Sequence, residues 1–112
     1  MEFVEKTFTY RGTTTTLHFR ELTAGEQLRL SQGVRSTVRD GVPEVTLDFA
    51  AEAERGHRLL QATLIDPATE EPVYSSAAKL QDELSTKVKI LVDIARAAQA
   101  DFAQKASEAG EG

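Results

Sequence analysis

From residue 3 to residue 20, apolar and polar residues alternate along the chain, which is the pattern of β-strands with one buried face. Val4 and Phe8 fall on one side of a first strand, and Phe19 falls on one side of a second. The residues between the strands, Arg11-Gly12, suit a tight turn in which the glycine takes a positive φ. The pattern therefore predicts a β-hairpin, which needs a covering helix or strands from another subunit because two strands alone are marginally stable.

A capping box follows the hairpin. The Thr23 hydroxyl can accept a hydrogen bond from the amide of Glu26, and the Glu26 carboxylate can accept one from the amide of Thr23. These residues predict a short helix that buries Leu28 and ends near Gly33. In residues 34–46 the apolar positions are too sparse for a helix, and an Asp-Gly pair and a proline are present. This stretch predicts a mobile loop with a short strand or helical turn near its start.

The central stretch, residues 48–65, has the period of an amphipathic helix. Its apolar stripe consists of Phe49, Ala53, His57, Leu60 and Leu64. Proline lacks an amide donor and restricts the residue before it, so Asp66-Pro67 predicts the end of this helix. The next segment, 66–75, contains two prolines and predicts an exposed turn, from which Val73 and Tyr74 return to the core.

The last third of the chain predicts two more helices. Ser76 is placed to cap a brief helix, and Ser85 is placed to cap a long one that runs to about Lys105. The long helix has one apolar stripe, made of Leu84, Val88, Leu91, Ala95, Ala98 and Phe102. Ile90 and Ile94 lie about 100° to its side and widen the apolar arc. Two interpretations stay open: the two isoleucines pack under the hairpin, or they form an exposed patch for self-association or partner binding.

The length of 112 residues predicts a single α+β domain over residues 1–106, in which the N-terminal β-hairpin packs with three to four helices and the C-terminal half is mainly helical. We expect the helices over residues 49–65 and 86–105 to form an antiparallel pair, and the centre of the core to consist of Leu60, Leu64, Val88, Leu91 and Ala95. Residues 107–112 predict a flexible acidic tail. The net charge of -5 argues against nucleic-acid binding, which depends on Lys and Arg. The chain has no cysteine, no apolar run of membrane-spanning length and no signal-peptide pattern, so the expected location is the cytoplasm.

No pattern in the sequence predicts a catalytic, metal or cofactor site. The two histidines, His18 and His57, are too few for a zinc site, and no phosphate-binding or dinucleotide-binding glycine motif is present. Glu52 and Glu54 do not share a helix face, and Glu70-Glu71 lies in a turn, so solvated charges are the better interpretation of these carboxylates. We therefore expect a protein that is not an enzyme and uses no cofactor.

Three features together resemble the small tail assembly chaperones of long-tailed (siphovirus-like) bacteriophages and prophages. The first is a hairpin that leads through Arg20, Glu21 and Thr23, an R-E-x-T pattern, into a short helix. The second is a helix that ends in hydrophobic residues and an Asp, followed by a turn and then by Pro, a hydrophobic residue, an aromatic residue and Ser. In this chain the pattern consists of Leu64, Ile65, Asp66, Pro72, Val73, Tyr74 and Ser75. The third is a last helix of leucines and alanines over residues 84–102. The resemblance covers residues 8–105, and it departs from the family where Thr69-Glu70-Glu71 replaces a Thr-Gly turn.

The resemblance implies a non-enzymatic factor that binds and solubilises the tape measure protein in the host bacterial cytoplasm during tail morphogenesis. In this family a frameshifted extension often recruits the tail tube protein, which is therefore a second expected partner. One alternative is a structural virion subunit, such as a tail-terminator or head-tail connector protein. Another is a small acidic regulator that binds a host protein.

The residues that we expect to contact a partner are Tyr74, Ile90 and Ile94. An aromatic residue in a proline-flanked turn can add buried area at small entropic cost, and the two isoleucines supply the apolar arc described above. We also expect a homo-oligomer, because the hairpin edge and the wide arc both leave surface that a second copy could cover. Neither a membrane nor a nucleic acid is an expected partner.

Overall fold

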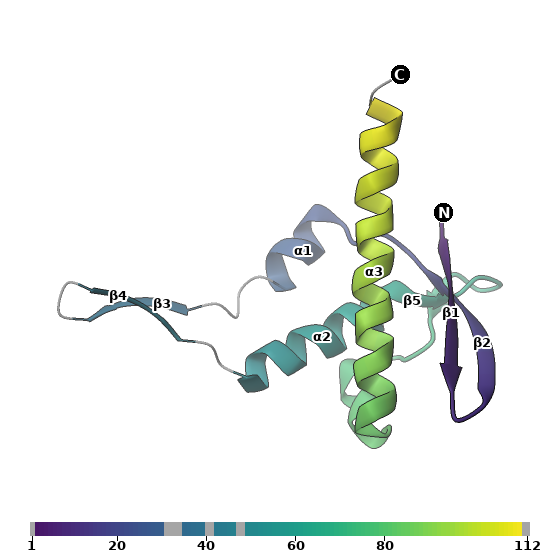
Figure 1. Cartoon of the computed structure of the whole chain (residues 1–112), viewed down its shortest axis with the longest axis horizontal. Helices are drawn as coiled ribbons and strands as arrows, with labels where there is room; N and C mark the ends of the chain where they lie inside the picture. The colour runs from purple at the N-terminus through teal and green to yellow at the C-terminus, as the bar shows by residue number, and fades with distance from the viewer. Residues whose placement is uncertain (1, 31–34, 40–41, 47–48, 111–112) are drawn as a thin grey trace.

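In this computed structural model the chain is described over residues 2–30, 35–39, 42–46 and 49–110, and it has an α+β fold with a mainly helical C-terminal half (Figure 1). Its elements in chain order are β1 (Val4–Tyr10), β2 (Thr13–Phe19), α1 (Ala24–Leu30), β3 (Arg35–Arg39), β4 (Val42–Thr46), α2 (Phe49–Thr63), β5 (Leu64–Asp66), β6 (Glu71–Pro72), the 3-10 helix η2 (Ala77–Asp82) and α3 (Ser85–Gly110). A four-stranded antiparallel sheet has the order β1-β2-β5-β6, and β3 and β4 form a separate sheet.

The strands β1 and β2 form the predicted hairpin. Both turn residues, Arg11 (φ 50°) and Gly12 (φ 82°), are left-handed, as a type I′ turn requires. The alternation of the sequence places Val4, Phe8 and Phe19 in the core, where all three are buried. Helix α3 packs against β1 and supplies the cover that the hairpin needs.

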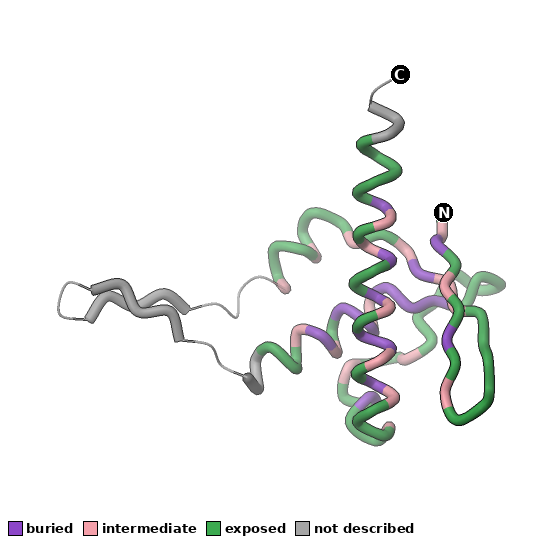
Figure 2. The backbone as a smooth tube through the Cα atoms, viewed as in Figure 1, coloured by how far each residue is buried: buried purple, intermediate pink, exposed green. Residues whose placement is uncertain are grey.

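The core forms where α2 and α3 meet the four-stranded sheet (Figure 2). The residues predicted as its centre are confirmed as buried: Leu60, Leu64, Val88, Leu91 and Ala95. The two helices were expected to form an antiparallel pair. They do contact each other, but α2 crosses α3 instead of lying beside it along its length (Figure 1).

The buried face of α2 is turned relative to the predicted stripe. Ala53 is exposed and His57 is only half-buried, whereas Gly56, Leu59 and Thr63 are buried. The Thr63 hydroxyl donates a 2.7 Å hydrogen bond to the Leu59 carbonyl, so a polar residue can lie in the core without an unsatisfied group. The buried face differs from the predicted one because α2 crosses α3, and at the crossing Gly56, not Ala53, lies against α3.

The end of α2 was predicted about two residues too late. Leu64 and Ile65 form β5, which pairs with His18 and Phe19 of β2. The amide of Arg20, which directly follows β2, donates a 2.9 Å hydrogen bond to the Thr63 carbonyl. The β2 edge therefore determines where the helix ends, because its buried backbone groups need partners.

In the stretch 34–46, the short strand predicted near the start is confirmed as β3, whereas the second strand, β4, was not predicted. The described positions within it form two strands, and β3 pairs with β4 from Arg35 opposite Thr46 to Arg39 opposite Val42. The β-branched residues of both segments favour this pairing. Pro43 follows the first position of β4, at the end of a two-stranded sheet, where a missing amide donor is tolerated.

The capping box of α1 is confirmed, although the predicted burial of Leu28 is wrong. The Glu26 amide donates to the Thr23 hydroxyl at 3.2 Å, and the Thr23 amide donates to the Glu26 carboxylate at 2.9 Å. Leu28 is 66% exposed, whereas Leu30 of α1 and Leu22, which precedes the helix, pack against the core.

The two predicted serine caps are not formed. Ser76 precedes η2 but makes no capping hydrogen bond with its side chain, and Ser85 is already the first residue of α3. The amide of Val88 donates to the carbonyl of Leu84, so Leu84 holds the cap position. At its other end α3 continues to Gly110, into the stretch predicted as a flexible tail.

The turn between β5 and β6 is exposed, as predicted, and it contains a strained residue. Glu70 has φ 60° at the position where the family resemblance led us to expect glycine. Val73 is 54% exposed and does not return to the core as predicted, whereas Tyr74 is half-buried. The Gln61 side-chain amide donates to the Tyr74 carbonyl at 3.2 Å and ties this segment to α2.

Candidate partner-binding groove

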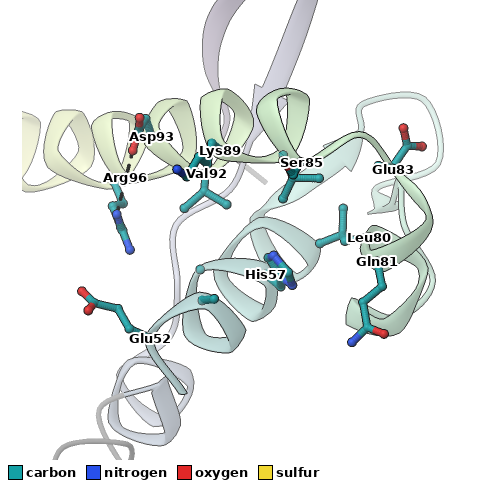
Figure 3. A pocket seen from close by; sticks show the side chains of 13 residues that line it. Glu52, His57, Leu80, Gln81, Glu83, Ser85, Lys89, Val92, Asp93 and Arg96 are labelled. Carbon is teal, nitrogen blue, oxygen red and sulfur yellow. Dashed lines mark ion pairs between the residues drawn. The ribbon is translucent and has the colours of Figure 1, made fainter. Parts of the chain in front are cut away.

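A groove of about 800 Å³ lies between α2, η2 and the first half of α3, which we call the α2/α3 groove (Figure 3). It is lined by Glu52, Ala53, Gly56 and His57 of α2, by Leu80 and Gln81 of η2, by Glu83, and by Ser85, Val88, Lys89, Val92, Asp93 and Arg96 of α3. Two stretches separated in sequence, residues 52–57 and residues 80–96, thus converge on one surface hollow.

The floor of the groove is apolar and fixed. Leu80, Val88 and Val92 are 1%, 5% and 8% exposed, and Gly56 of α2 is buried beside them. A Cβ atom added at Gly56 would lie 3.0 Å from the Val92 Cγ1 atom, which is closer than carbon atoms normally pack. Glycine at this position therefore allows α2 to approach α3, and the approach shapes the floor.

The rim of the groove carries charges of both signs. Glu52 and Arg96 point toward each other at one end (Figure 3), and Lys89 and Asp93 lie along the α3 wall. The Asp93 and Arg96 side chains approach to 3.9 Å, at the limit of an ion pair, and both are more than half exposed. Such exposed charges contribute little to folding, so they are available to a partner.

His57 lies at the middle of the groove and is half-buried (Figure 3). It is the one histidine in the lining, and among the described residues no group of three or more His, Cys, Asp or Glu side chains is placed to hold a metal ion. An apolar floor with a charged rim suits the recognition of an amphipathic helix, whose apolar stripe would cover the floor.

A second hollow, of about 440 Å³, lies on the α1 side of the same crossing. Its lining shares Glu52, Gly56 and Arg96 with the α2/α3 groove and adds Leu22 and Gln99, among others. Surface suited to a partner thus extends to both sides of the point where α2 crosses α3.

The R-E-x-T segment is a structural clamp. The Arg20 guanidinium donates two hydrogen bonds to the Glu26 carboxylate, at 2.9 and 2.5 Å, and this pairing lowers the pKa of Glu26 from 4.5 to about 2. The Gln99 side chain of α3 accepts from the Leu22 amide at 3.0 Å and donates to the Arg20 carbonyl at 2.8 Å. The segment thereby joins the sheet, α1 and α3, and the hydrogen bonds to Glu26 raise the pKa of Arg20.

The residues expected from the sequence to contact a partner lie outside the α2/α3 groove. Ile90 and Ile94 are partly buried and pack against the core, so the structure favours the interpretation in which they serve the fold. At about 100° per residue, both lie on the side of α3 opposite Val92. Tyr74 also packs against the core; burial raises the pKa of its hydroxyl, and the Glu83 carboxylate raises it further.

The groove itself was not predicted from the sequence. Its clearest signal is Gly56, because an isolated glycine within a helical pattern often marks a close approach of two backbones. The apolar side chains of the floor looked like ordinary core positions, and in the structure they are core positions that also border solvent.

Comparisons of the chain with models of protein families, with curated proteins and with solved structures found no match. None of the helices in the described part of the chain combines the length and the apolar composition needed to cross a membrane.

Proposed function

We propose that this chain is a non-enzymatic tail assembly chaperone of a long-tailed bacteriophage or prophage, which binds the tape measure protein and keeps it soluble in the host bacterial cytoplasm. The tail tube protein would be recruited through a frameshifted extension, as the family resemblance implies. The observation that carries the proposal is the α2/α3 groove, with its apolar floor and charged rim.

Physical chemistry links the groove to this function. A tape measure protein is a long helical chain, and its apolar stripes would aggregate if they stayed exposed before the tail tube forms. A helix that lays such a stripe in the groove would remove its own apolar surface from water, together with the part of the lining that is still exposed, such as Ala53. The mixed charges of the rim would then set the register of the bound helix.

The test is co-expression with the tape measure protein from the same operon, with the soluble fraction of that protein as the measurement. Ala53 lines the groove and is exposed, so Ala53→Glu places a charge there without disturbing the core. Ala97 is exposed on α3 and lies outside the lining, so Ala97→Glu is the matched control. We expect the parent chain and Ala97→Glu to solubilise the tape measure protein and Ala53→Glu to fail.

Two results would contradict the proposal. If the parent chain leaves the tape measure protein insoluble, the protein is not its chaperone. If mass spectrometry finds the chain in purified particles, it is a structural virion subunit, because an assembly chaperone leaves before the particle is complete.

A further inference from the structure

The outer edge of β1 has no pairing strand in the part of the chain that the structure describes. β1 is an edge strand of the sheet β1-β2-β5-β6, and it packs on α3. Its inner edge pairs with β2, from Val4 opposite Phe19 to Tyr10 opposite Thr13. Within the described part of the chain, no strand pairs with its other edge. A free edge of this kind is a template for another strand.

The hairpin geometry determines which backbone groups face outward. The two-residue turn makes Tyr10 and Thr13 a hydrogen-bonded pair, and hydrogen-bonded and non-bonded pairs then alternate along an antiparallel ladder. The N–H and C=O groups of Glu5, Thr7 and Thr9 therefore point away from β2. The side chains of these three residues are exposed.

We propose that a second copy of this chain pairs antiparallel with the outer edge of β1, about a two-fold axis at Thr7. Thr7 then lies opposite Thr7 of the second copy, and Glu5 lies opposite Thr9 of the second copy. The three outward residues of each strand exchange backbone hydrogen bonds, so two four-stranded sheets become one continuous sheet. This inference is independent of the proposed partner in the α2/α3 groove.

The charges along β1 favour this register and this occupant. A two-fold axis at Glu5 would place the Glu5 carboxylates of the two copies opposite each other, which is unfavourable. With the axis at Thr7, each Glu5 lies opposite the uncharged Thr9 of the other copy. An inward-pointing lysine usually protects an edge strand. Here Lys6 is paired with Asp101 of α3, with its Nζ atom 2.5 Å from Oδ2, so its charge is compensated within the chain.

The other edge of the hairpin is less suitable. β2 has its own outward groups at Thr14 and Thr16, by the same alternation. However, β5 pairs with His18 and Phe19 and thereby interrupts this edge, whereas no strand among the described residues pairs with the outer edge of β1 at any of its seven residues. Thr16 on β2 therefore provides a control for Thr7 on β1.

Single cysteines test the register directly, because the chain contains no cysteine of its own. In the proposed pairing the two Cα atoms at position 7 are about 5.5 Å apart, within the range of a disulfide, whereas those at position 5 are about 14 Å apart. Under mild oxidation we expect Thr7→Cys to form a covalent dimer and Glu5→Cys and Thr9→Cys alone to stay unlinked. A mixture of Glu5→Cys and Thr9→Cys chains should form a linked heterodimer. Equal cross-linking of all variants, or none at position 7, would overturn the proposal.

Proline substitution tests the association without cross-linking. Thr7→Pro removes an outward amide donor and leaves the β1–β2 ladder intact, and Thr16→Pro does the same on the opposite edge. In sedimentation velocity we expect the parent chain to dimerise with increasing concentration, Thr16→Pro to do the same, and Thr7→Pro to dimerise more weakly by on the order of tenfold or more. A monomeric parent, or equal effects of the two prolines, would overturn the proposal. Circular dichroism checks the fold, and if Thr7→Pro unfolds, the cysteine variants decide.

Discussion

Replacement of Gly56 by alanine tests the helix crossing that shapes the α2/α3 groove. The added methyl group would lie 3.0 Å from the Val92 Cγ1 atom, and Val92 is 8% exposed and has one strongly preferred rotamer in a helix. Alanine gains about 1 kcal/mol of helix propensity over glycine, whereas overpacking costs about 1–3 kcal/mol. We therefore expect Gly56→Ala to lower the free energy of unfolding by up to about 2 kcal/mol, as measured by urea denaturation.

Two controls show whether the contact with Val92 is responsible. A methyl group added at Gly25 in α1 would have only the flexible end of the Arg29 side chain near it, at 3.7 Å, so Gly25→Ala should be neutral or stabilising. In a Val92→Ala background, Gly56→Ala should cost less, and the difference measures the coupling between the two sites. If Gly56→Ala stabilises the chain as much as Gly25→Ala does, the helices are not in close contact there and the reasoning is wrong.

Three further predictions concern the clamp, the strained turn and the isoleucines. The pKa of Glu26 falls from 4.5 to about 2 on folding, so its pairing with Arg20 stabilises the fold fully above about pH 5. This stabilisation is at most about 3 kcal/mol, and it is lost as the pH falls toward 2. Urea denaturation as a function of pH should show this slope for the parent chain and lose it in Glu26→Gln. Glu70→Gly should raise the free energy of unfolding by about 1 kcal/mol, because glycine adopts φ 60° without strain; a loss of stability would mean that the contacts of the Glu70 side chain outweigh the strain. Changing Ile90 and Ile94 together to Asp should destabilise the chain by several kcal/mol, because both pack against the core; unchanged stability would mean that they are exposed and free for a partner.

Local sequence signals predicted the first part of the fold correctly. The alternation of apolar residues and the Arg11-Gly12 turn determine the hairpin, and Thr23 and Glu26 determine the start of α1. Each of these signals acts between residues that are close in sequence, so no knowledge of the tertiary structure is needed.

Where the prediction failed, residues distant in sequence decide the structure. Leu64 and Ile65 continue a helical pattern, yet they form β5 because the edge of β2 needs backbone partners. The exposure of Leu28 follows from how α1 lies on α2, which its seven residues do not reveal.

The candidate site could not be predicted for the same reason. The wide apolar arc drew attention to Ile90 and Ile94, whereas the groove opens on the opposite side of α3, and its position depends on the approach of α2 at Gly56. The sequence does contain that glycine, but only the structure pairs it with Val92.

The measurement that tests the central claim most directly is methyl NMR of the chain during titration with a helical segment of the tape measure protein. The two sides of α3 carry different methyl groups, because Val88 and Val92 border the groove with Leu80, whereas Ile90 and Ile94 lie on the opposite side. The proposed function predicts shifts of the valine and leucine methyl signals that saturate with added segment, while the isoleucine signals stay in place. Saturating shifts confined to the isoleucines, or no shift at any of these methyl groups, would contradict it.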